Sequence, residues 1–355
     1  MEPVRFSGNP IVRPQDVAPS APGLEVIGAF NAGAVQFGEE TVLLLRVAET
    51  AKIIDPEYVP IVTADPAEGA VRVIQVPRDS PDLDMTDPRQ IIYRGRRYLS
   101  TVSHLRLARS RDGRHFTIDR HATVAPRTPY EIYGIEDPRI TPLGEEGGEG
   151  GRRFLVTYTA VSDRGVCVGL LETRDFVEFR RLGIIFTPDN KDVVIFPSAI
   201  DGRYVVLHRP SGSYLGSQDI WLAYSDNLLY WGDHRHLVPR RPGMWDGARV
   251  GAGAVPFKTP EGWLEIYHGA DSQNHYYLGA VLLDLHDPSK VLARSRDPLM
   301  SPLETYEQTG FFKNTVFTCG VVPQADGGLR IYYGAADQVT AVADTTLDAV
   351  MDSLR

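Results

Sequence analysis

The sequence predicts an all-β protein of the β-propeller class, and three observations lead to this prediction. Pairs of apolar, β-rich runs joined by a glycine-containing turn recur along most of the 355 residues, which is typical of β-hairpins. The turn glycines follow one another at intervals of 51 to 65 residues, at Gly38, Gly95, Gly151, Gly202, Gly262 and Gly327. Such an interval suits one four-stranded propeller blade made of two hairpins. Helical periodicity is nearly absent, so strands must supply almost the whole core.

Each hairpin is predicted by alternation of apolar and polar residues on both sides of its turn. In chain order the hairpins lie at 34–46, at 90–102, on both sides of 144–153, and at 198–208, 254–268 and 320–334. Three further segments each combine a short strand, a polar turn and an aromatic residue, at 107–116, 170–179 and 222–231. The count of six hairpins does not fix the number of blades, because terminal segments can share one blade. A pair of β-sandwiches is the less favoured alternative, since the repeat continues through most of the chain.

The chain is expected to form one domain over 1–355, because no low-complexity linker divides it. The Gly- and Glu-rich stretch 144–153 is expected to be a surface loop inserted between two strands. The last residues, 345–355, are expected to form a short helix or a tail.

Composition excludes several classes of function. With 37 Lys plus Arg against 46 Asp plus Glu, the formal charge is −9, which disfavours nucleic-acid binding. No run approaches the roughly 18 apolar residues of a membrane span. Two cysteines and the absence of a signal-peptide pattern at the start favour a soluble protein of the reducing cytoplasm. Homo-oligomerisation stays open.

The sequence lacks the common cofactor and nucleophile motifs. It has no GxxxxGK[ST] loop, no strand followed by GxGxxG, no HExxH, no CxxC and no GxSxG elbow. We therefore expect no metal and no organic cofactor. Sugar chemistry carried by carboxyl groups remains.

Polar residues beside Gly or Pro recur where the inner strands of a propeller would begin. The segments are FNAGAV (30–35), TDPRQI (86–91), GIEDPRIT (134–141), NKDVVIFP (190–197), RVGAGAVP (249–256) and NTVFTCG (314–320). A second polar set ends the following strands and includes Arg46, His208, Arg209, His268 and Asp337. Any one of these residues alone is better explained as part of a turn or an ion pair. Together they predict a polar and aromatic cavity that suits a sugar.

Several of these segments, in this order, resemble glycoside hydrolase family 130, the β-mannoside phosphorylases and their hydrolytic relatives. They are FNAGAV with LLLRVAE, GIEDPRIT, NKDVVIFP with VVLHRP, RVGAGAVP with GWLEIYHGAD, and YYGAADQVTAVA, between about residues 9 and 348. The resemblance implies a five-bladed β-propeller with the active site at the mouth of its central channel, so we expect five blades rather than six.

The resemblance also implies roles for individual residues. Asp137 of the EDPR motif is expected to be the general acid, passing its proton through the 3-hydroxyl of the mannosyl unit. Lys191, Arg209 and Arg249 are expected to bind phosphate; Arg249 stands where many relatives have lysine. The residues expected to bind the mannosyl unit are Asn31, Arg46, Arg89, His208, His268 and Asp337.

The expected reaction is inverting phosphorolysis of a β-mannoside, giving α-mannose 1-phosphate and a shortened acceptor. Phosphate is already an anion, so a single acid suffices, whereas an inverting hydrolase also needs a base to activate water. The closest-looking branch acts on β-1,2-linked mannobiose or oligomannan. A β-1,4-mannosyl phosphorylase, a β-mannosidase and a non-catalytic carbohydrate-binding propeller are the alternatives. The sequence does not decide whether burial raises the pKa of Asp137 more than Arg139 lowers it.

Overall fold

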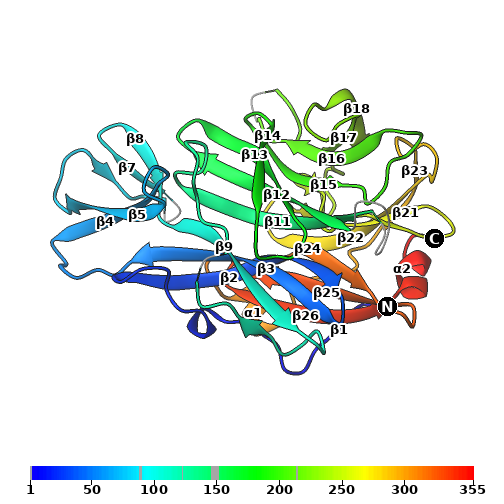
Figure 1. Cartoon of the computed structure of the whole chain (residues 1–355), viewed down its shortest axis with the longest axis horizontal. Helices are drawn as coiled ribbons and strands as arrows, with labels where there is room; N and C mark the ends of the chain where they lie inside the picture. The colour runs from blue at the N-terminus through cyan, green and yellow to red at the C-terminus, as the bar shows by residue number, and fades with distance from the viewer. Residues whose placement is uncertain (1, 88–89, 122, 145–151, 213–214) are drawn as a thin grey trace.

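The structure is a computed structural model that describes residues 2–355 except 88–89, 122, 145–151 and 213–214 (Figure 1). The predicted all-β class is confirmed. Besides strands, the described residues contain the short helices α1 (Thr305–Gln308) and α2 (Leu347–Asp352) and a 3-10 turn at Pro14–Asp16. Helix α2 falls in the segment where a short helix or a tail was expected, and the Thr346 side chain caps its first turn.

The body consists of four sheets whose strands are mostly neighbours in sequence. The first sheet joins the two ends of the chain: β1 (Val4–Arg5) pairs with β26 (Val339–Thr346), which is followed by β25 (Gly328–Ala335) and β24 (Val316–Pro323). Another sheet contains β15 (Asn190–Ile195), β16 (Tyr204–Pro210), β17 (Ile220–Ser225) and β18 (Gly232–Val238). A further sheet contains β19 (Arg249–Gly251), β21 (Trp263–Ala270), β22 (Tyr276–Leu283) and β23 (Val291–Arg294), with β20 (Phe257–Lys258) paired to β21.

The eight-stranded sheet is two antiparallel groups joined side by side. One group holds β2 (Leu24–Phe37), β3 (Glu40–Ala51), β9 (Val102–Ser110) and β10 (Thr117–Ile118). The other holds β11 (Gly134–Leu143), β12 (Arg153–Ser162), β13 (Gly165–Thr173) and β14 (Arg180–Phe186). They meet where Ser103 pairs in parallel with Gly134. The described body therefore divides into five strand groups in chain order, although no closed sheet joins them.

A small lobe is inserted between β3 and β9 and stands at the left of Figure 1. It contains the pair β4 (Tyr58–Asp65) and β5 (Ala70–Pro77), and the three-stranded sheet β6 (Leu83–Asp84), β7 (Gln90–Tyr93) and β8 (Arg96–Leu99). The predicted hairpin at 90–102 is the β7–β8 hairpin of this lobe, so counting it among the repeats of the body was wrong. The reason is long-range pairing: β3 pairs with β9 directly across the inserted residues.

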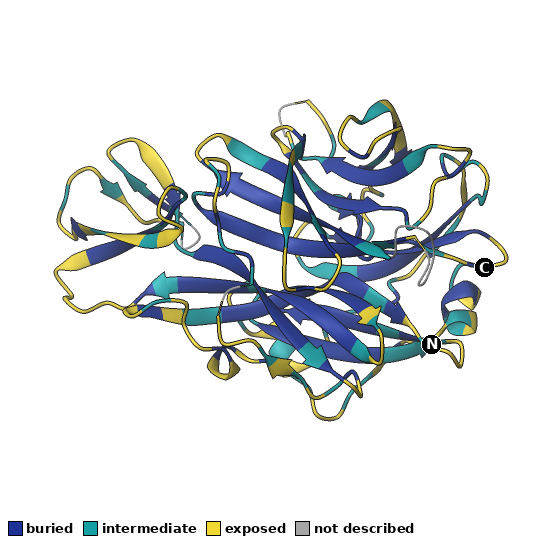
Figure 2. Ribbon diagram, viewed as in Figure 1, coloured by how far each residue is buried: buried dark blue, intermediate teal, exposed yellow. Residues whose placement is uncertain are grey.

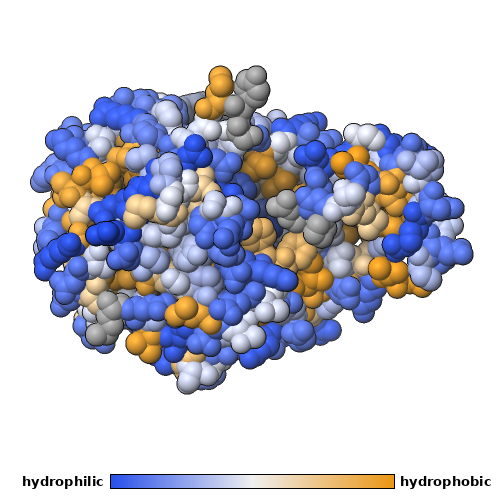
Figure 3. Space-filling view, turned by 180° about the vertical axis from the view of Figure 1, so that it is seen from behind, coloured by the Kyte–Doolittle hydropathy of each residue, from blue (hydrophilic) through white to orange (hydrophobic). Residues whose placement is uncertain are grey.

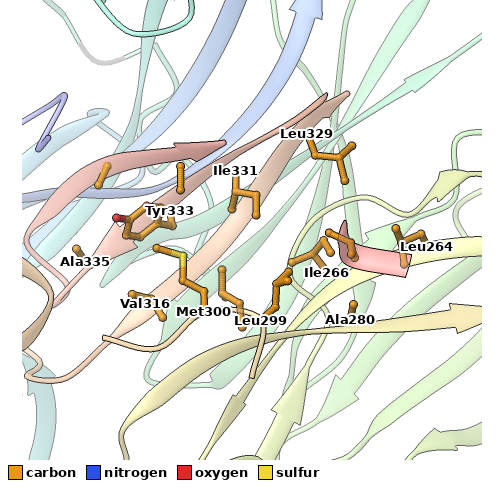
Figure 4. Packing of buried hydrophobic residues seen from close by; sticks show 14 of the residues in the cluster. Leu264, Ile266, Ala280, Leu299, Met300, Val316, Leu329, Ile331, Tyr333 and Ala335 are labelled. Carbon is orange, nitrogen blue, oxygen red and sulfur yellow. The ribbon is translucent and has the colours of Figure 1, made fainter. Parts of the chain in front are cut away.

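The core lies between neighbouring sheets. In Figure 4, Ile266 of β21 lies near Ile331 of β25, and Met300 lies beside Tyr333 in the same buried cluster. Figure 2 shows that the strands of the body are largely buried, whereas the inserted lobe is more exposed. Hydrophilic residues cover most of the face in Figure 3, where hydrophobic residues form separate patches. Across the described residues, no helix is long and apolar enough to cross a membrane.

Candidate active site

β-bulges interrupt the first strand of four of the five strand groups. The register shifts fall between Phe30 and Gly33 in β2, Glu136 and Arg139 in β11, Lys191 and Val194 in β15, and Thr318 and Gly320 in β24. At three of these bulges a polar residue has a left-handed backbone, with φ of 47° at Asn31, 49° at Asp137 and 54° at Asp192. Such strain in non-glycine residues is concentrated at functional sites. A bulge also redirects a side chain, and these three side chains belong to one connected polar cluster.

Asp137 is almost fully buried, with 7% exposure. Its Oδ1 accepts hydrogen bonds from Asn31 Nδ2 at 2.9 Å and from Arg46 Nη1 at 3.1 Å. Arg139 Nη1 donates to the main-chain carbonyl of Asp137 at 3.0 Å. Burial acts to raise the pKa of Asp137, but Arg46, Arg139, the Asn31 hydrogen bond and Lys191 outweigh it and hold the pKa below its ordinary value. These positive groups therefore outweigh burial in setting the pKa of Asp137, which is the balance that the sequence left open.

The Arg46 guanidinium binds two carboxyl groups and interacts with the charge of a third. Its Nη1 binds Asp137 and its Nη2 donates to Glu136 Oε1 at 2.8 Å, while Nε donates to Ser103 Oγ at 3.3 Å. The third carboxyl group belongs to Asp337. Burial, together with the charges of Asp137 and Glu136, raises the pKa of Asp337 to about 7 against the attraction of Arg46.

Asp192 is the centre of a second, deeper ion-pair network. Its Oδ1 pairs with Arg139 Nη2 at 3.2 Å, and its Oδ2 pairs with Arg209 Nη2 at 3.0 Å and with His268 Nε2 at 3.1 Å. Burial acts to raise the pKa of Asp192, but Arg209, His268 and Arg139 lower it well below its usual range. The sequence prediction missed Asp192. The available signal was a carboxylate directly before the apolar run VVIF of the segment NKDVVIFP.

The three predicted phosphate ligands have different surroundings. Arg209 is buried, and its Nε and Nη1 have no hydrogen-bond partner among the described residues. Lys191 is partly exposed and lies near enough to lower the pKa of Asp137. Arg249 is held by Tyr276 Oη at 2.6 Å and by Asn274 Oδ1 at 2.8 Å.

An aromatic group links Arg249 to the Asp192 network. The Arg249 guanidinium carbon lies over the Tyr276 ring, 4.9 Å from its centroid. The centroids of the Tyr276 and His268 rings are 6.0 Å apart. Phe317 lies against His268, with ring centroids 4.1 Å apart. Burial lowers the pKa of His268 to about 4 although Asp192 opposes it, so the imidazole is neutral and donates through Nε2. Arg249 and His268 therefore belong to one wall of the cluster.

The hydrogen bonds of the His208 ring go to two side chains outside the Asp137 and Asp192 networks. Its Nδ1 accepts from Asn190 Nδ2 at 3.0 Å, so its Nε2 donates to His234 Nδ1 at 3.1 Å. Its ring stacks on Phe186, with centroids 4.6 Å apart. His208 thus reaches the cluster only through Asn190, which precedes Lys191, and its role in substrate binding stays a prediction.

The structure thus connects most of the predicted site residues through the Asp137 and Asp192 networks. Arg89 lies outside the described residues. The described parts of the chain contain no group of three or more His, Cys, Asp or Glu side chains placed to hold a metal ion.

Comparison with known proteins finds one matching family and several similar enzymes. Residues 87–355 match the family model of glycoside hydrolase family 130, described as β-1,4-mannooligosaccharide phosphorylase. A β-1,2-mannobiose phosphorylase of Listeria innocua is 44% identical over 99% of this chain and 98% of its own length. A 1,2-β-oligomannan phosphorylase of Thermoanaerobacter is 39% identical over 70% of this chain and 80% of its own. The solved Listeria β-1,2-mannobiose phosphorylase complex superimposes with a TM-score of 0.93 at 43% identity, covering 100% of this chain and 99% of that one.

Proposed function

Because the chain belongs to glycoside hydrolase family 130, we propose that it is an inverting phosphorylase of β-1,2-linked mannobiose or oligomannan. The reaction converts the mannoside and inorganic phosphate to α-mannose 1-phosphate and a shortened acceptor. Two relatives that act on β-1,2-linked mannosides support this linkage over the β-1,4-linked alternative. Their phosphorolytic chemistry likewise gives no support to a β-mannosidase or a non-catalytic binding propeller.

One observation supports phosphate as the attacking group more than any other. Arg209 is buried next to the carboxylate of Asp192, and two of its donor nitrogens have no partner among the residues that the structure describes. Leaving a buried charged donor without a partner is costly, and an oxyanion with several acceptor oxygens would supply the missing partners. With Lys191 and Arg249 on neighbouring strands, Arg209 would offset the charge of phosphate and orient it for attack.

In this proposal Asp137 is the acid of the reaction. Asn31 and Arg46 hold its carboxyl group in place, and Asp337 and His268 bind the mannosyl unit beside it. The incoming phosphate adds negative charge near Asp137, which favours its protonated form. No second carboxyl group is required to activate water.

The proposal also includes the number of propeller blades, the co-substrate and the cellular compartment. The five strand groups would be the blades of a five-bladed propeller, with the bulged strands β2, β11, β15 and β24 around its central channel. Phosphate is a co-substrate, and no cofactor is needed. We place the enzyme in the cytoplasm, where phosphate is available, and leave its assembly into homo-oligomers to experiment.

A panel of disaccharides tests this function. The enzyme is incubated with β-1,2-mannobiose, β-1,4-mannobiose and 4-O-β-mannosyl-glucose at one phosphate concentration, and the sugar phosphate is identified by ³¹P NMR. We expect α-mannose 1-phosphate chiefly from β-1,2-mannobiose. Preferential turnover of either β-1,4-linked substrate would reject the linkage, and the β-anomer of the product would reject inversion.

A further inference from the structure

Arg139 joins the two polar networks of the candidate site. It is almost fully buried, with 1% exposure. Its Nη1 donates to the main-chain carbonyl of Asp137 at 3.0 Å, and its Nη2 donates to Asp192 Oδ1 at 3.2 Å. Asp192 in turn pairs with Arg209. In the proposed function Asp137 is the acid and Arg209 binds phosphate, so the position of Arg139 affects both groups.

Two main-chain carbonyl groups of a short segment between β19 and β20 accept further hydrogen bonds from Arg139. Its Nε donates to Gly253 O at 3.2 Å, and its Nη2 donates to Ala252 O at 3.1 Å. Both residues lie outside the strands. The hydrogen-bond ladder of a sheet therefore does not fix these carbonyl groups, and other contacts must hold the segment in place.

The segment is held close to strand β21. Gly253 N donates to Glu265 Oε1 at 2.8 Å, and Ala254 N donates to Ile266 O at 3.1 Å. A Cβ atom on residue 253 would clash with Ile266 O, so this approach requires glycine. Gly253 thus binds Glu265 through its amide and Arg139 through its carbonyl.

Glu265 is a carboxyl residue in a fully buried position, with 0% exposure. Its Oε1 accepts the hydrogen bond from Gly253, whereas its Oε2 has no partner among the described residues. A buried polar atom without a partner is costly, and an apolar side chain would fill the space without this cost. Burial raises the pKa of Glu265 well above its ordinary value, which favours the neutral form. The hydrogen bond to Gly253 therefore indicates a role other than stability.

We infer that Glu265 is a positioning residue of the reaction, because it holds Gly253 and thereby fixes Arg139. Arg139 then sets the positions of Asp137 and Asp192. The inference rests on the proposed function and extends it to a residue that acts through its neighbours. Misplacement of a reacting group by roughly 1 Å can lower a rate by about 10²-fold.

Two substitutions of Glu265 separate the hydrogen bond from the filling of space. Glu265→Gln keeps an acceptor oxygen for Gly253 N, whereas Glu265→Leu fills the position without one. Initial rates at varied phosphate, measured beside a thermal melt, give kcat and the KM for phosphate. We expect Glu265→Gln to stay near the wild type. Glu265→Leu should lose about 10- to 100-fold in kcat and show a higher KM for phosphate.

Thr259→Val is the matched control, in the turn between β20 and β21. The buried Thr259 hydroxyl accepts hydrogen bonds from Glu261 N at 3.2 Å and Gly262 N at 3.1 Å. The control therefore also removes hydrogen bonds between a side chain and the main chain. It should melt at a lower temperature but keep the wild-type kcat and phosphate KM. Equal kinetic losses in Thr259→Val and Glu265→Leu would point to general loosening of the sheet and would overturn the inference.

A double-mutant cycle tests the route through Arg139. Arg139→Lys keeps a positive charge beside Asp192 but lacks the planar donors that bind Gly253 O. If Glu265 acts through Arg139, Glu265→Leu should lower kcat much less in the Arg139→Lys background than in the wild type. The same fold loss in both backgrounds would overturn the inference. If Glu265→Leu does not fold, Glu265→Met, with a more adaptable apolar side chain, takes its place.

Two further results of these measurements would reject the role of Glu265. One is a wild-type kcat and phosphate KM in Glu265→Leu. The other is a Glu265→Gln variant as impaired as Glu265→Leu, since the acceptor oxygen would then not be the property that matters. Failure of the proposed function has a different signature, because the wild type itself would then release no α-mannose 1-phosphate from mannobiose.

Discussion

The Arg209 guanidinium and the Asp192 carboxylate lie 3.0 Å apart in a buried ion pair, and Nη2 is the one guanidinium nitrogen that has a partner within the described part of the chain. Asp192 also binds Arg139 and His268. One carboxylate thus fixes the direction in which Arg209 presents its other donors. In the proposed reaction, those donors bind the attacking phosphate.

Replacing Arg209 by lysine is expected to weaken phosphate binding and leave mannobiose binding nearly unchanged. Lysine keeps a charge for Asp192 but lacks the planar fork of donors. Hydrogen bonds to charged groups contribute about 1.5–3 kcal/mol, so the KM for phosphate should rise roughly 10- to 150-fold. Initial rates at varied phosphate measure this. Arg203→Lys is the control, because this partly exposed arginine directly precedes β16 and binds Asp233. An unchanged phosphate KM in Arg209→Lys would contradict the assignment.

Replacing Asp192 by asparagine is expected to destabilise the whole protein. The side chains of Asp192, Arg139 and Arg209 are 2%, 1% and 6% exposed, so the change leaves two buried guanidinium groups without their counter-charge. Breaking a buried pair from one side costs about 3–5 kcal/mol. Urea denaturation checks this against Asp233→Asn, which removes an exposed ion pair and should change little. If both variants unfold at the same urea concentration, the network does not stabilise the fold.

Asp137→Asn should fold normally and lose turnover of mannobiose. Asparagine keeps the size of the side chain and can still bind Asn31, but it cannot hold a transferable proton. Removal of a general acid lowers rates by about 10²- to 10⁴-fold. Release of mannose 1-phosphate, measured beside a circular dichroism melt, separates lost chemistry from lost structure. Near-wild-type turnover would exclude Asp137 as the acid.

The raised pKa of Asp337 predicts a pH-dependent stability in the absence of any ligand. Its ordinary pKa is 3.8 and its folded value is about 7, so between these pH values the folded protein binds a proton that the unfolded chain does not. Stability contributed by this group is full below about pH 4 and is lost as the pH rises to about 7. The melting temperature of Asp337→Asn minus that of the wild type should therefore increase across this window and level off outside it. A difference that stays constant from pH 4 to pH 9 would contradict the raised pKa.

Local patterns in the sequence were sufficient for the all-β class and for much of the site. Asp137 and Arg46 were assigned to one site through the resemblance of their motifs to glycoside hydrolase family 130, and a hydrogen bond of 3.1 Å joins their side chains in the structure. The inserted lobe escaped prediction because its β7–β8 hairpin has the same local signature as a hairpin of the body. Only the pairing of β3 with β9, which skips about fifty residues, separates the two.

The deeper parts of the site depend on contacts that no sequence pattern displays. Asp192 of β15 contacts Arg139 and His268, which belong to strands far away in the chain. Burial and the charges of Asp137 and Glu136 raise the pKa of Asp337, whereas Arg46 and Arg139 lower the pKa of Asp137 against the effect of burial. These charged groups come from different strands. The substrate-binding role expected of His208 stays a prediction; within the described residues its ring makes hydrogen bonds with Asn190 and His234.

The dependence of bond cleavage on phosphate tests the central claim most directly. The enzyme is incubated with β-1,2-mannobiose in ¹⁸O-labelled water, with and without inorganic phosphate, and the products are analysed by mass spectrometry. The account predicts unlabelled mannose 1-phosphate when phosphate is present and almost no cleavage when it is absent. Labelled free mannose, formed equally fast without phosphate, would show that water is the nucleophile and would contradict the account.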